Sequence, residues 1–158
     1  MDLFSEAFDL FAKKWALLTS GSMDDFNTMT IGWGALGTLW GKSVVTVYVK
    51  PARYTHGFMD RNDLFTVSFY SDEYKKDMGT LGKYSGRDTD KIAMTSLTPV
   101  EAAGGVSFKE AEVTLVARKI YSQDLDTAKM PEEVVRKTYS DEAPHTMYVG
   151  EIVEIIRK

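Results

Sequence analysis

The segment TIGWGALGTLWGKSVVTVYV, residues 30–49, contains a G-x-G-x-x-G pattern between Gly32 and Gly37. In a dinucleotide-binding unit this pattern opens a helix, which then crosses over to a second, parallel strand. Here only TLWGKS separates the pattern from the β-branched run VVTVYV, which leaves too few residues for a crossover helix. The run also ends at Lys50 and Pro51, without the acidic residue that binds a ribose. The pattern therefore favours a structure other than a nucleotide-binding turn.

Two interpretations of these glycines remain open. They are bends and close approaches in a curved strand that also carries Trp33 and Trp40, or they are gaps beside a strand where a flat ligand lies against exposed backbone. A planar aromatic ligand suits the second interpretation. The glycines concerned are Gly32, Gly34, Gly37 and Gly41.

Strand-forming sequence dominates the rest of the chain. Five runs are rich in β-branched and aromatic residues, at positions 15–20, 44–49, 64–69, 111–121 and 147–156. In the third run Phe65, Val67 and Phe69 alternate with small hydroxyl residues, and this period of two predicts a half-buried antiparallel strand. Gly104-Gly105 between two strand-like runs predicts a hairpin, which adds a strand near residues 98–101.

Helical patterns are short and lie singly between the strands. Phe4, Phe8, Phe11 and Trp15 recur at helical spacing, which predicts an N-terminal helix that packs by this aromatic stripe. Further helices are expected at residues 56–61, 74–78 closed by Gly79, near 88–94, and 131–138. Together the patterns predict a mainly β fold, a closed or nearly closed antiparallel barrel with peripheral helices.

Composition narrows the class of protein. The chain has 158 residues, of which 44% are hydrophobic, and no break in composition, so one domain over residues 1–158 is expected. The absence of cysteine excludes disulfides, iron–sulfur clusters, thiolate zinc sites and a nucleophilic thiol. Neither histidine stands in a metal-ligand pair, so no metal site is expected. The formal charge of -4 is interspersed, which argues against nucleic-acid or membrane partners, and a soluble, cytoplasmic protein is expected.

Three segments carry a resemblance to a known family. NTMTIGWGALGTLWGKSVVTVYVKPARYT at 27–55, SGRDTDK at 85–91 and HTMYVGEIVEI at 145–155 closely resemble the flavin reductase-like family, flavoredoxin branch. The first block is the most specific, because N-x-M-T, W-G and R-Y-T stand in the family's order and spacing. The resemblance implies an FMN-binding split barrel. It also implies a homodimer with the flavin at or near the subunit interface, and NADH or NADPH as electron donor.

The resemblance assigns the flavin phosphate to two groups of residues. Arg53 and Thr55 are the first group, and Thr55 could also cap a helix that begins at the next residue. Ser85, Arg87 and Lys91 are the second group, although the pattern S-x-x-D is equally typical of ordinary helix capping. The family often has Cys or His just before this serine, whereas the present chain has Lys and Tyr.

The resemblance places the flavin ring system along the N-x-M-T segment. The residues that would line it are Asn27, Thr28, Met29 and Thr30, partly through backbone groups. Trp33 would lie nearby, with a core position on the barrel wall as the alternative. His145, before the last strand, would lie close to the flavin as a catalytic group, with a structural hydrogen-bonding role as the alternative.

The implied function is hydride transfer from NAD(P)H to flavin and onward transfer of electrons to an acceptor. A flavin carries the redox chemistry itself, which agrees with a sequence that shows no nucleophile–base pair, carboxylate pair or metal cage. An FMN electron carrier that oxidises NAD(P)H poorly is the nearest alternative. A small-barrel module that binds oligonucleotides, and a pyridoxamine phosphate oxidase-like or flavin-sensing barrel, are the others.

Overall fold

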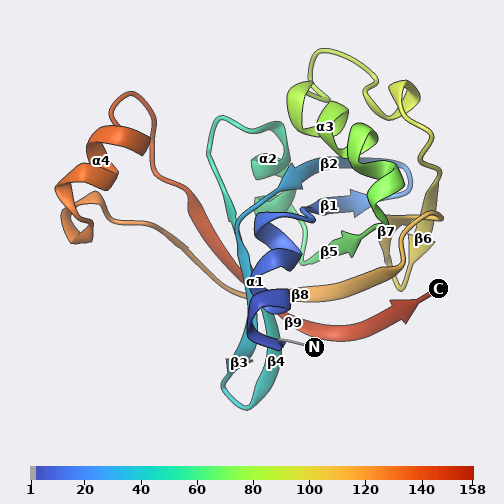
Figure 1. Ribbon diagram of the computed structural model, residues 1–158, viewed down its shortest axis with the longest axis horizontal. Coiled ribbons are helices and arrows are strands. Elements are labelled where there is room, and N and C mark those ends of the chain that lie inside the picture. Colours follow the sequence, from blue (N-terminus) through green and yellow to red (C-terminus); the bar gives the residue numbers. More distant parts are fainter. Residues whose placement is uncertain (1–2) are drawn as a thin grey trace.

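The computed structural model describes residues 3–158, so Met1 and Asp2 lie outside the described residues. A seven-stranded antiparallel sheet with strand order β2-β1-β5-β8-β9-β4-β3 forms the body of the protein (Figure 1). Its strands are β1 (Ala16–Ser22), β2 (Asp25–Ile31), β3 (Gly34–Leu39), β4 (Lys42–Val49), β5 (Leu64–Phe69), β8 (Val113–Asp124) and β9 (Thr146–Arg157). A separate hairpin consists of β6 (Pro99–Ala102) and β7 (Gly105–Phe108).

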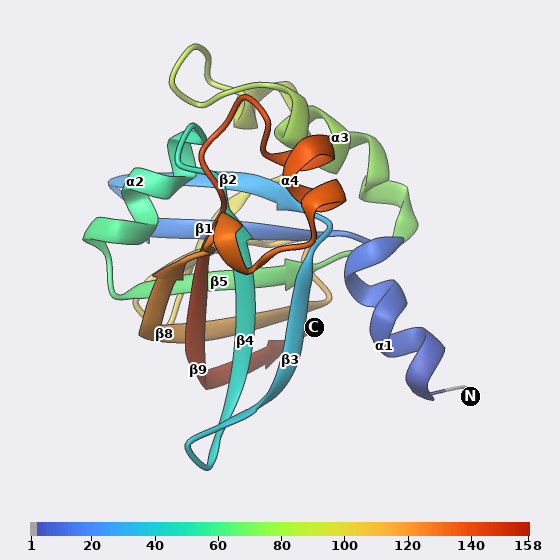
Figure 2. The same ribbon diagram turned by 90° about the vertical axis from the view of Figure 1, so that its left-hand side faces the viewer.

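The sheet curls into a barrel that stays open along one seam. Its two edge strands, β2 and β3, are consecutive in the chain and are joined by Gly32 and Trp33, yet they are not hydrogen-bonded neighbours in the sheet of residues 3–158. Figure 2 shows the curvature, with β3 and β4 standing across the end of the β1, β2 and β5 layer. The predicted mainly β, antiparallel barrel is confirmed, and it is a split barrel.

The glycine-rich segment forms a β-hairpin. β3 pairs antiparallel with β4 from Gly34↔Val47 to Leu39↔Lys42, so no crossover helix follows the pattern. Trp40 and Gly41 have φ angles of 53° and 72°, the positive values of a two-residue type I′ turn. A Cβ at Gly34 would lie 2.5 Å from the ring of Phe11, whereas a Cβ at Gly37 would meet nothing within 4 Å. The interpretation as bends and close approaches therefore holds for Gly34 and Gly41, but not for Gly37.

Strand β5 is buried on both faces, so the prediction of a half-buried strand is wrong here. The polar face of β5 is covered by the β6–β7 hairpin, as the contacts between these strands show. The Thr66 hydroxyl donates to the Val106 carbonyl at 2.6 Å, and Ser68 shares a hydrogen bond of 2.9 Å with Ser107. Alternation in the sequence identifies the polar face, but hydroxyl side chains with partners can be buried as readily as exposed.

The predicted hairpin is confirmed, with its turn shifted by one residue. Ala102 pairs with Gly105, so the turn residues are Ala103 and Gly104, with φ angles of 47° and 91°. The expected extra strand near residues 98–101 is β6.

The N-terminal helix α1 (Leu3–Ala12) forms, but it does not pack by the predicted aromatic stripe. Phe4 and Phe8 are 75% and 71% exposed. Only the last turn reaches the barrel, where Phe11 is buried and makes an edge-to-face contact with Phe69 at 5.6 Å. Trp15 lies beyond the end of the helix. Periodicity identified the apolar face of this helix, but only part of that face has a partner within the chain.

The remaining helices lie outside the barrel. They are α2 (Tyr54–Arg61), α3 (Lys75–Lys83) and α4 (Glu132–Thr138), with short 3₁₀ turns at Asp72–Tyr74, Ile92–Met94 and Thr127–Lys129. The expected end of a helix at Gly79 is wrong, because α3 continues to Lys83 and buries Leu81 beyond that glycine. Figure 1 shows α4, drawn in orange, on an arm that extends away from the barrel between β8 and β9. None of the helices in residues 3–158 is long and apolar enough to cross a membrane.

Candidate functional site

A small cavity with three cationic side chains lies at the start of α2. Its volume is about 90 Å³. Arg53, Lys83 and Lys91 contribute the positive charges, and no acidic residue lines it. The full lining is Asn27, Met29, Ala52, Arg53, Tyr54, Thr55, Lys83, Tyr84, Ser85, Gly86 and Lys91. In a chain with a net charge of -4, this lining is a local concentration of positive charge that could hold an anion.

The hydroxyl of Thr55 is fixed in this cavity by a contact with β2. Asn27 donates a hydrogen bond of 2.8 Å from Nδ2 to Thr55 Oγ1, and both side chains are buried. Gly86 lies directly against Asn27, since a Cβ at that position would come within 2.2 Å of Asn27 Oδ1. Only glycine therefore fits at residue 86 with Asn27 in this place.

The alternative that Thr55 caps the helix is wrong, because α2 begins at Tyr54, two residues before the expected start at His56. Arg53 occupies the N-cap position, and no side chain caps this end of the helix. The first backbone N–H groups of a helix have no partner within the helix, and together with the helix dipole they attract an anion. The uncapped start of α2 therefore adds to the positive character of the cavity.

Arg53 and Lys91 are both held by the last turn of α3. Lys91 Nζ donates to the Leu81 carbonyl at 2.9 Å, and the Arg53 guanidinium donates to the Gly82 carbonyl at 3.4 Å. Carbonyl groups at the end of a helix carry partial negative charge, which stabilises nearby cations. Lys91 is only 3% exposed. Its burial and the charge of Arg53 lower the pKa of the Lys91 ammonium from 10.5 to about 8.

Ser85 and Arg87 are arranged differently from the capping alternative. The Ser85 hydroxyl accepts a hydrogen bond of 3.2 Å from the backbone N–H of Arg87 and none from Asp88, whose N–H instead donates to the Ser85 carbonyl. Ser85 belongs to the cavity lining. Arg87 is exposed at its edge, with its guanidinium 5.3 Å from the centre of the Tyr54 ring.

A second cavity of about 190 Å³ adjoins the first, and Met29 lines both. Its lining is Met29, Thr30, Ile31, Gly32, Trp33, Tyr48, Lys50 and His145. Trp33 is 58% exposed, so the alternative of a core tryptophan is wrong. Thr28 lines neither cavity, because its buried hydroxyl is hydrogen-bonded to Thr19 and to the Leu18 carbonyl. The second cavity thus combines an exposed indole with a buried imidazole.

His145 is held at the wall of the second cavity. Its ring centre lies 5.1 Å from the Trp33 ring centre, and its Nδ1 is 2.7 Å from the Tyr139 hydroxyl. Lys50, nearby, forms an ion pair with Glu142. Burial and the charge of Lys50 lower the pKa of His145, while the charge of Glu142 acts in the opposite direction. The imidazole is therefore held in its neutral form near pH 7.

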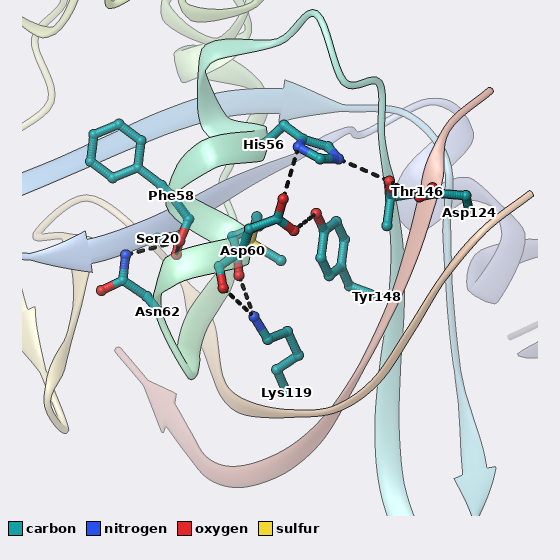
Figure 3. A network of polar contacts seen from close by, with 10 residues as sticks. Ser20, His56, Phe58, Asp60, Asn62, Lys119, Asp124, Thr146 and Tyr148 are labelled. Atoms are coloured by element: carbon teal, nitrogen blue, oxygen red, sulfur yellow. Dashed lines mark hydrogen bonds and ion pairs between the residues drawn. The ribbon is translucent and has the colours of Figure 1, made fainter. Parts of the chain in front are cut away.

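A network of polar contacts ties α2 to the end of β8 and the start of β9, which directly follows His145 (Figure 3). Thr146 donates its hydroxyl proton to Asp124 at 2.6 Å, so it accepts the 2.8 Å hydrogen bond from His56 Nε2. Asp60 lies 3.3 Å from His56 Nδ1 and accepts a 2.6 Å hydrogen bond from the hydroxyl of Tyr148. Burial and this bond to Asp60 raise the pKa of Tyr148. The helix that carries Arg53 and Thr55 is thereby fixed relative to β9.

Several lining residues were not predicted from the sequence. In the first cavity they are Ala52, Tyr54, Lys83, Tyr84 and Gly86, and in the second they are Ile31, Tyr48 and Lys50. Gly32, which also lines the second cavity, is one of the glycines named for a flat ligand. Most of the residues that were not predicted are neighbours in the chain of predicted residues, so closeness in the sequence could have identified them. Tyr139 lines neither cavity and gave no local signal, because its role depends on the fold that brings it to His145.

Comparison with known proteins adds the family. A sequence profile described as a flavin reductase like domain matches residues 8–158. The chain belongs to the flavin reductase like family. This membership confirms the resemblance found in the sequence. Among proteins similar to this family member, an uncharacterised protein of Archaeoglobus fulgidus is 27% identical over 148 residues, 92% of this chain and 73% of that protein.

Solved structures share the fold of this flavin reductase-like chain. The flavoredoxin of Desulfovibrio vulgaris (Miyazaki F) has a TM-score of 0.71 and 21% identity, over 91% of this chain and 69% of that one. An FMN-binding protein from Thermus thermophilus, crystallised with bound 1-cyclohex-2-enone, has a TM-score of 0.71 and 19% identity, over 90% of this chain and 69% of that one. At these identities the likeness establishes the fold.

The lowered pKa of Lys91 predicts a pH-dependent stability. In the unfolded chain the amine keeps its ordinary pKa of 10.5, so between about pH 8 and that value the unfolded state binds more protons than the folded state. The contribution of Lys91 to stability therefore increases as the pH rises through this window. We expect the free energy of unfolding, measured with urea, to rise more for the wild type than for Lys91→Met when the pH is raised from about 7 to about 10.

Lys129→Met is the control, because Lys129 is exposed on a 3₁₀ turn. The effect of Lys129→Met on the free energy of unfolding is subtracted from that of Lys91→Met at each pH. If the remaining difference between the wild type and Lys91→Met is the same at both pH values, Lys91 is not desolvated in the folded protein.

Proposed function

We propose that the chain binds FMN, with the phosphate in the cationic cavity and the ring system along β2 toward His145. The observation that carries the proposal is the acid-free cavity at the uncapped start of α2, which adjoins the Trp33 cavity through Met29. Charged and hydroxyl donors suit a phosphate, and an adjoining cavity with aromatic walls suits a planar ring. The residues present therefore fit FMN by the chemistry of their donors.

Each group of residues has a separate task in this proposal. Arg53, Lys91 and the hydroxyls of Thr55 and Ser85 hold the phosphate. β2 is an edge strand of the sheet, so backbone groups on its unpaired side can hydrogen-bond the heteroatoms of the ring system. Trp33 shields one side of the ring cavity from water, and His145 offers a ring nitrogen. FMN, when bound, supplies the redox chemistry, which none of these side chains could provide.

The proposed reaction is oxidation of NADH or NADPH with reduction of flavin, followed by electron transfer to a second acceptor. Membership in the flavin reductase like family supports this reaction. The flavoredoxin fold neighbour favours the second candidate, an FMN electron carrier that oxidises NAD(P)H poorly. A cytoplasmic location is part of the proposal, since reduced nicotinamide cofactors are supplied there.

The phosphate assignment predicts that Arg53→Ala weakens FMN binding by about 10- to 100-fold, because a hydrogen bond to a charged group contributes about 1.5–3 kcal/mol. Quenching of flavin fluorescence measures the affinity. Riboflavin lacks the phosphate, so its affinity should be equal in the variant and the wild type. Arg61→Ala, a charge removed from the last turn of the same helix, should leave FMN binding unchanged.

Two results would contradict this assignment. FMN affinity that is unaffected by Arg53→Ala would place the phosphate elsewhere. An equal loss of FMN and riboflavin affinity would show that Arg53 acts through the fold and not through the phosphate.

The reductase proposal predicts rapid loss of flavin absorbance near about 450 nm when the FMN-loaded protein is mixed with NADH or NADPH without oxygen. Stopped-flow absorbance with each donor in turn measures the rate. A reduction no faster than that of free FMN would favour the electron carrier. Arg61→Ala again serves as the control that should match the wild type.

We also propose that two copies form a homodimer through a groove bounded by α1, β3 and β9. The groove has a volume of about 460 Å³, and Leu36 and Ile155 on its lining are 48% and 49% exposed. Apolar side chains exposed together on an edge strand and its surroundings are typical of a contact with another chain. A second copy presents the same apolar surface, which is what a two-fold contact requires.

The dimer proposal predicts a species of twice 17.7 kDa in sedimentation equilibrium. The double variant Leu36→Glu with Ile155→Glu should sediment as a monomer, because association would bury two charges in each copy. Val134→Glu, on the exposed face of α4, is the matched control and should stay dimeric. A monomeric wild type would overturn the proposal.

A further inference from the structure

Two neighbours fix the imidazole of His145. Tyr139 Oη lies 2.7 Å from Nδ1, and the Trp33 ring packs beside the imidazole with 5.1 Å between ring centres. The backbone is fixed as well, since the His145 carbonyl accepts a hydrogen bond of 3.0 Å from Leu125. His145 is 8% exposed and Tyr139 is 9% exposed. The ring therefore has one orientation, and its protonation pattern follows from its neighbours.

The direction of the Tyr139–His145 hydrogen bond can be argued from the two groups. A phenol is a good donor and a weak acceptor, whereas the unprotonated nitrogen of a neutral imidazole is a good acceptor. Among residues 3–158, the Tyr139 hydroxyl has no other hydrogen-bond partner. If Nδ1 donated instead, the phenolic proton of a buried tyrosine would be left without an acceptor, at a cost in free energy.

The charged groups around the ring keep the imidazole neutral. Lys50, at the end of β4, opposes a second positive charge on His145, and burial acts in the same direction. Glu142, from the segment between α4 and β9, favours the charge, but it is ion-paired with Lys50. Its effect on the imidazole is the smallest of the three. A neutral ring carries one proton, so a bond that occupies Nδ1 as acceptor leaves that proton on Nε2.

We propose that Tyr139 is a positioning residue that donates to Nδ1 of His145 and so fixes the Nε2–H tautomer at the wall of the second cavity. His145 is then a hydrogen-bond donor toward a ligand in that cavity, not an acceptor. Nε2 has no hydrogen-bond partner within the described chain, so it is available to a ligand. A carbonyl oxygen or an unprotonated ring nitrogen of the ligand is the matching group.

The ligand part of this inference rests on the proposed function, because it takes a flavin or a molecule that reacts with one as the occupant of the cavity. The tautomer part does not. It concerns two side chains of the protein alone and can be measured without any cofactor.

The test is nitrogen-15 NMR of the imidazole groups in the cofactor-free protein. The chain has only two histidines, so His56 provides an internal reference. We expect His145 of the wild type to show a single tautomer protonated at Nε2. Tyr139→Phe removes only the hydroxyl, and we expect a mixture of both tautomers and a rise in the titration midpoint of His145, because the neutral form loses a hydrogen bond.

Tyr121→Phe removes the hydroxyl of an exposed tyrosine and should leave the spectrum of His145 unchanged. A wild-type spectrum with the proton on Nδ1, or a tautomer and midpoint unaltered by Tyr139→Phe, would overturn the inference. The wild-type measurement needs no variant, so it stands even if Tyr139→Phe folds poorly.

A second measurement separates this inference from the proposed function. Riboflavin affinity is compared between the wild type and Tyr139→Phe by fluorescence quenching. A several-fold loss in the variant supports a donor role of His145 toward the ring. Equal riboflavin affinity overturns that role and leaves the tautomer result standing, whereas absence of any flavin binding by the wild type overturns the proposed function.

Discussion

The open seam between β2 and β3 is the constraint on which the site depends. The chain leaves one edge of the sheet and enters the other within Gly32 and Trp33, so the two edges stay close together without pairing. An unpaired edge usually invites aggregation, and proteins cover or shorten it. Here residues of β2 line both cavities, so the strand edge that a closed barrel would pair lies beside them.

The side chains of the cationic cavity are held in place by contacts within the chain. The last turn of α3 holds Arg53 and Lys91 by its carbonyl groups, while Asn27 fixes the hydroxyl of Thr55. The low pKa of Lys91 reflects the cost of keeping these charges together in a buried place. Preorganised donors of this kind lose little entropy on binding, because their side chains are already ordered. The contacts of His56 extend this order from α2 to β9.

Much of the fold and of the site could be predicted from local sequence. The β-branched runs, the hairpin at Gly104 and most residues around Arg53 follow from patterns within one element or from the family resemblance, whereas the hairpin of β3 and β4 was not predicted. Long-range relations could not be predicted. The exposure of Phe8 depends on whether the chain offers a surface that covers it. The burial of Ser68 depends on the β6–β7 hairpin that covers β5. The hydrogen bond of Tyr139 depends on the loop that brings His145 back to the barrel. Alternation and spacing describe one element, whereas these relations join several.

Both cavities lie along β2, but Met29 is the only residue that lines both of them. In the proposed function the phosphate side belongs to the start of α2 and the segment after α3, and the other side belongs to Trp33 and the loop that ends at His145. Under that assignment, mutations in the loop would alter the second cavity without touching the residues that hold the phosphate. Such a division would let substitutions around the second cavity change its ligands one at a time while the cationic cavity stays the same.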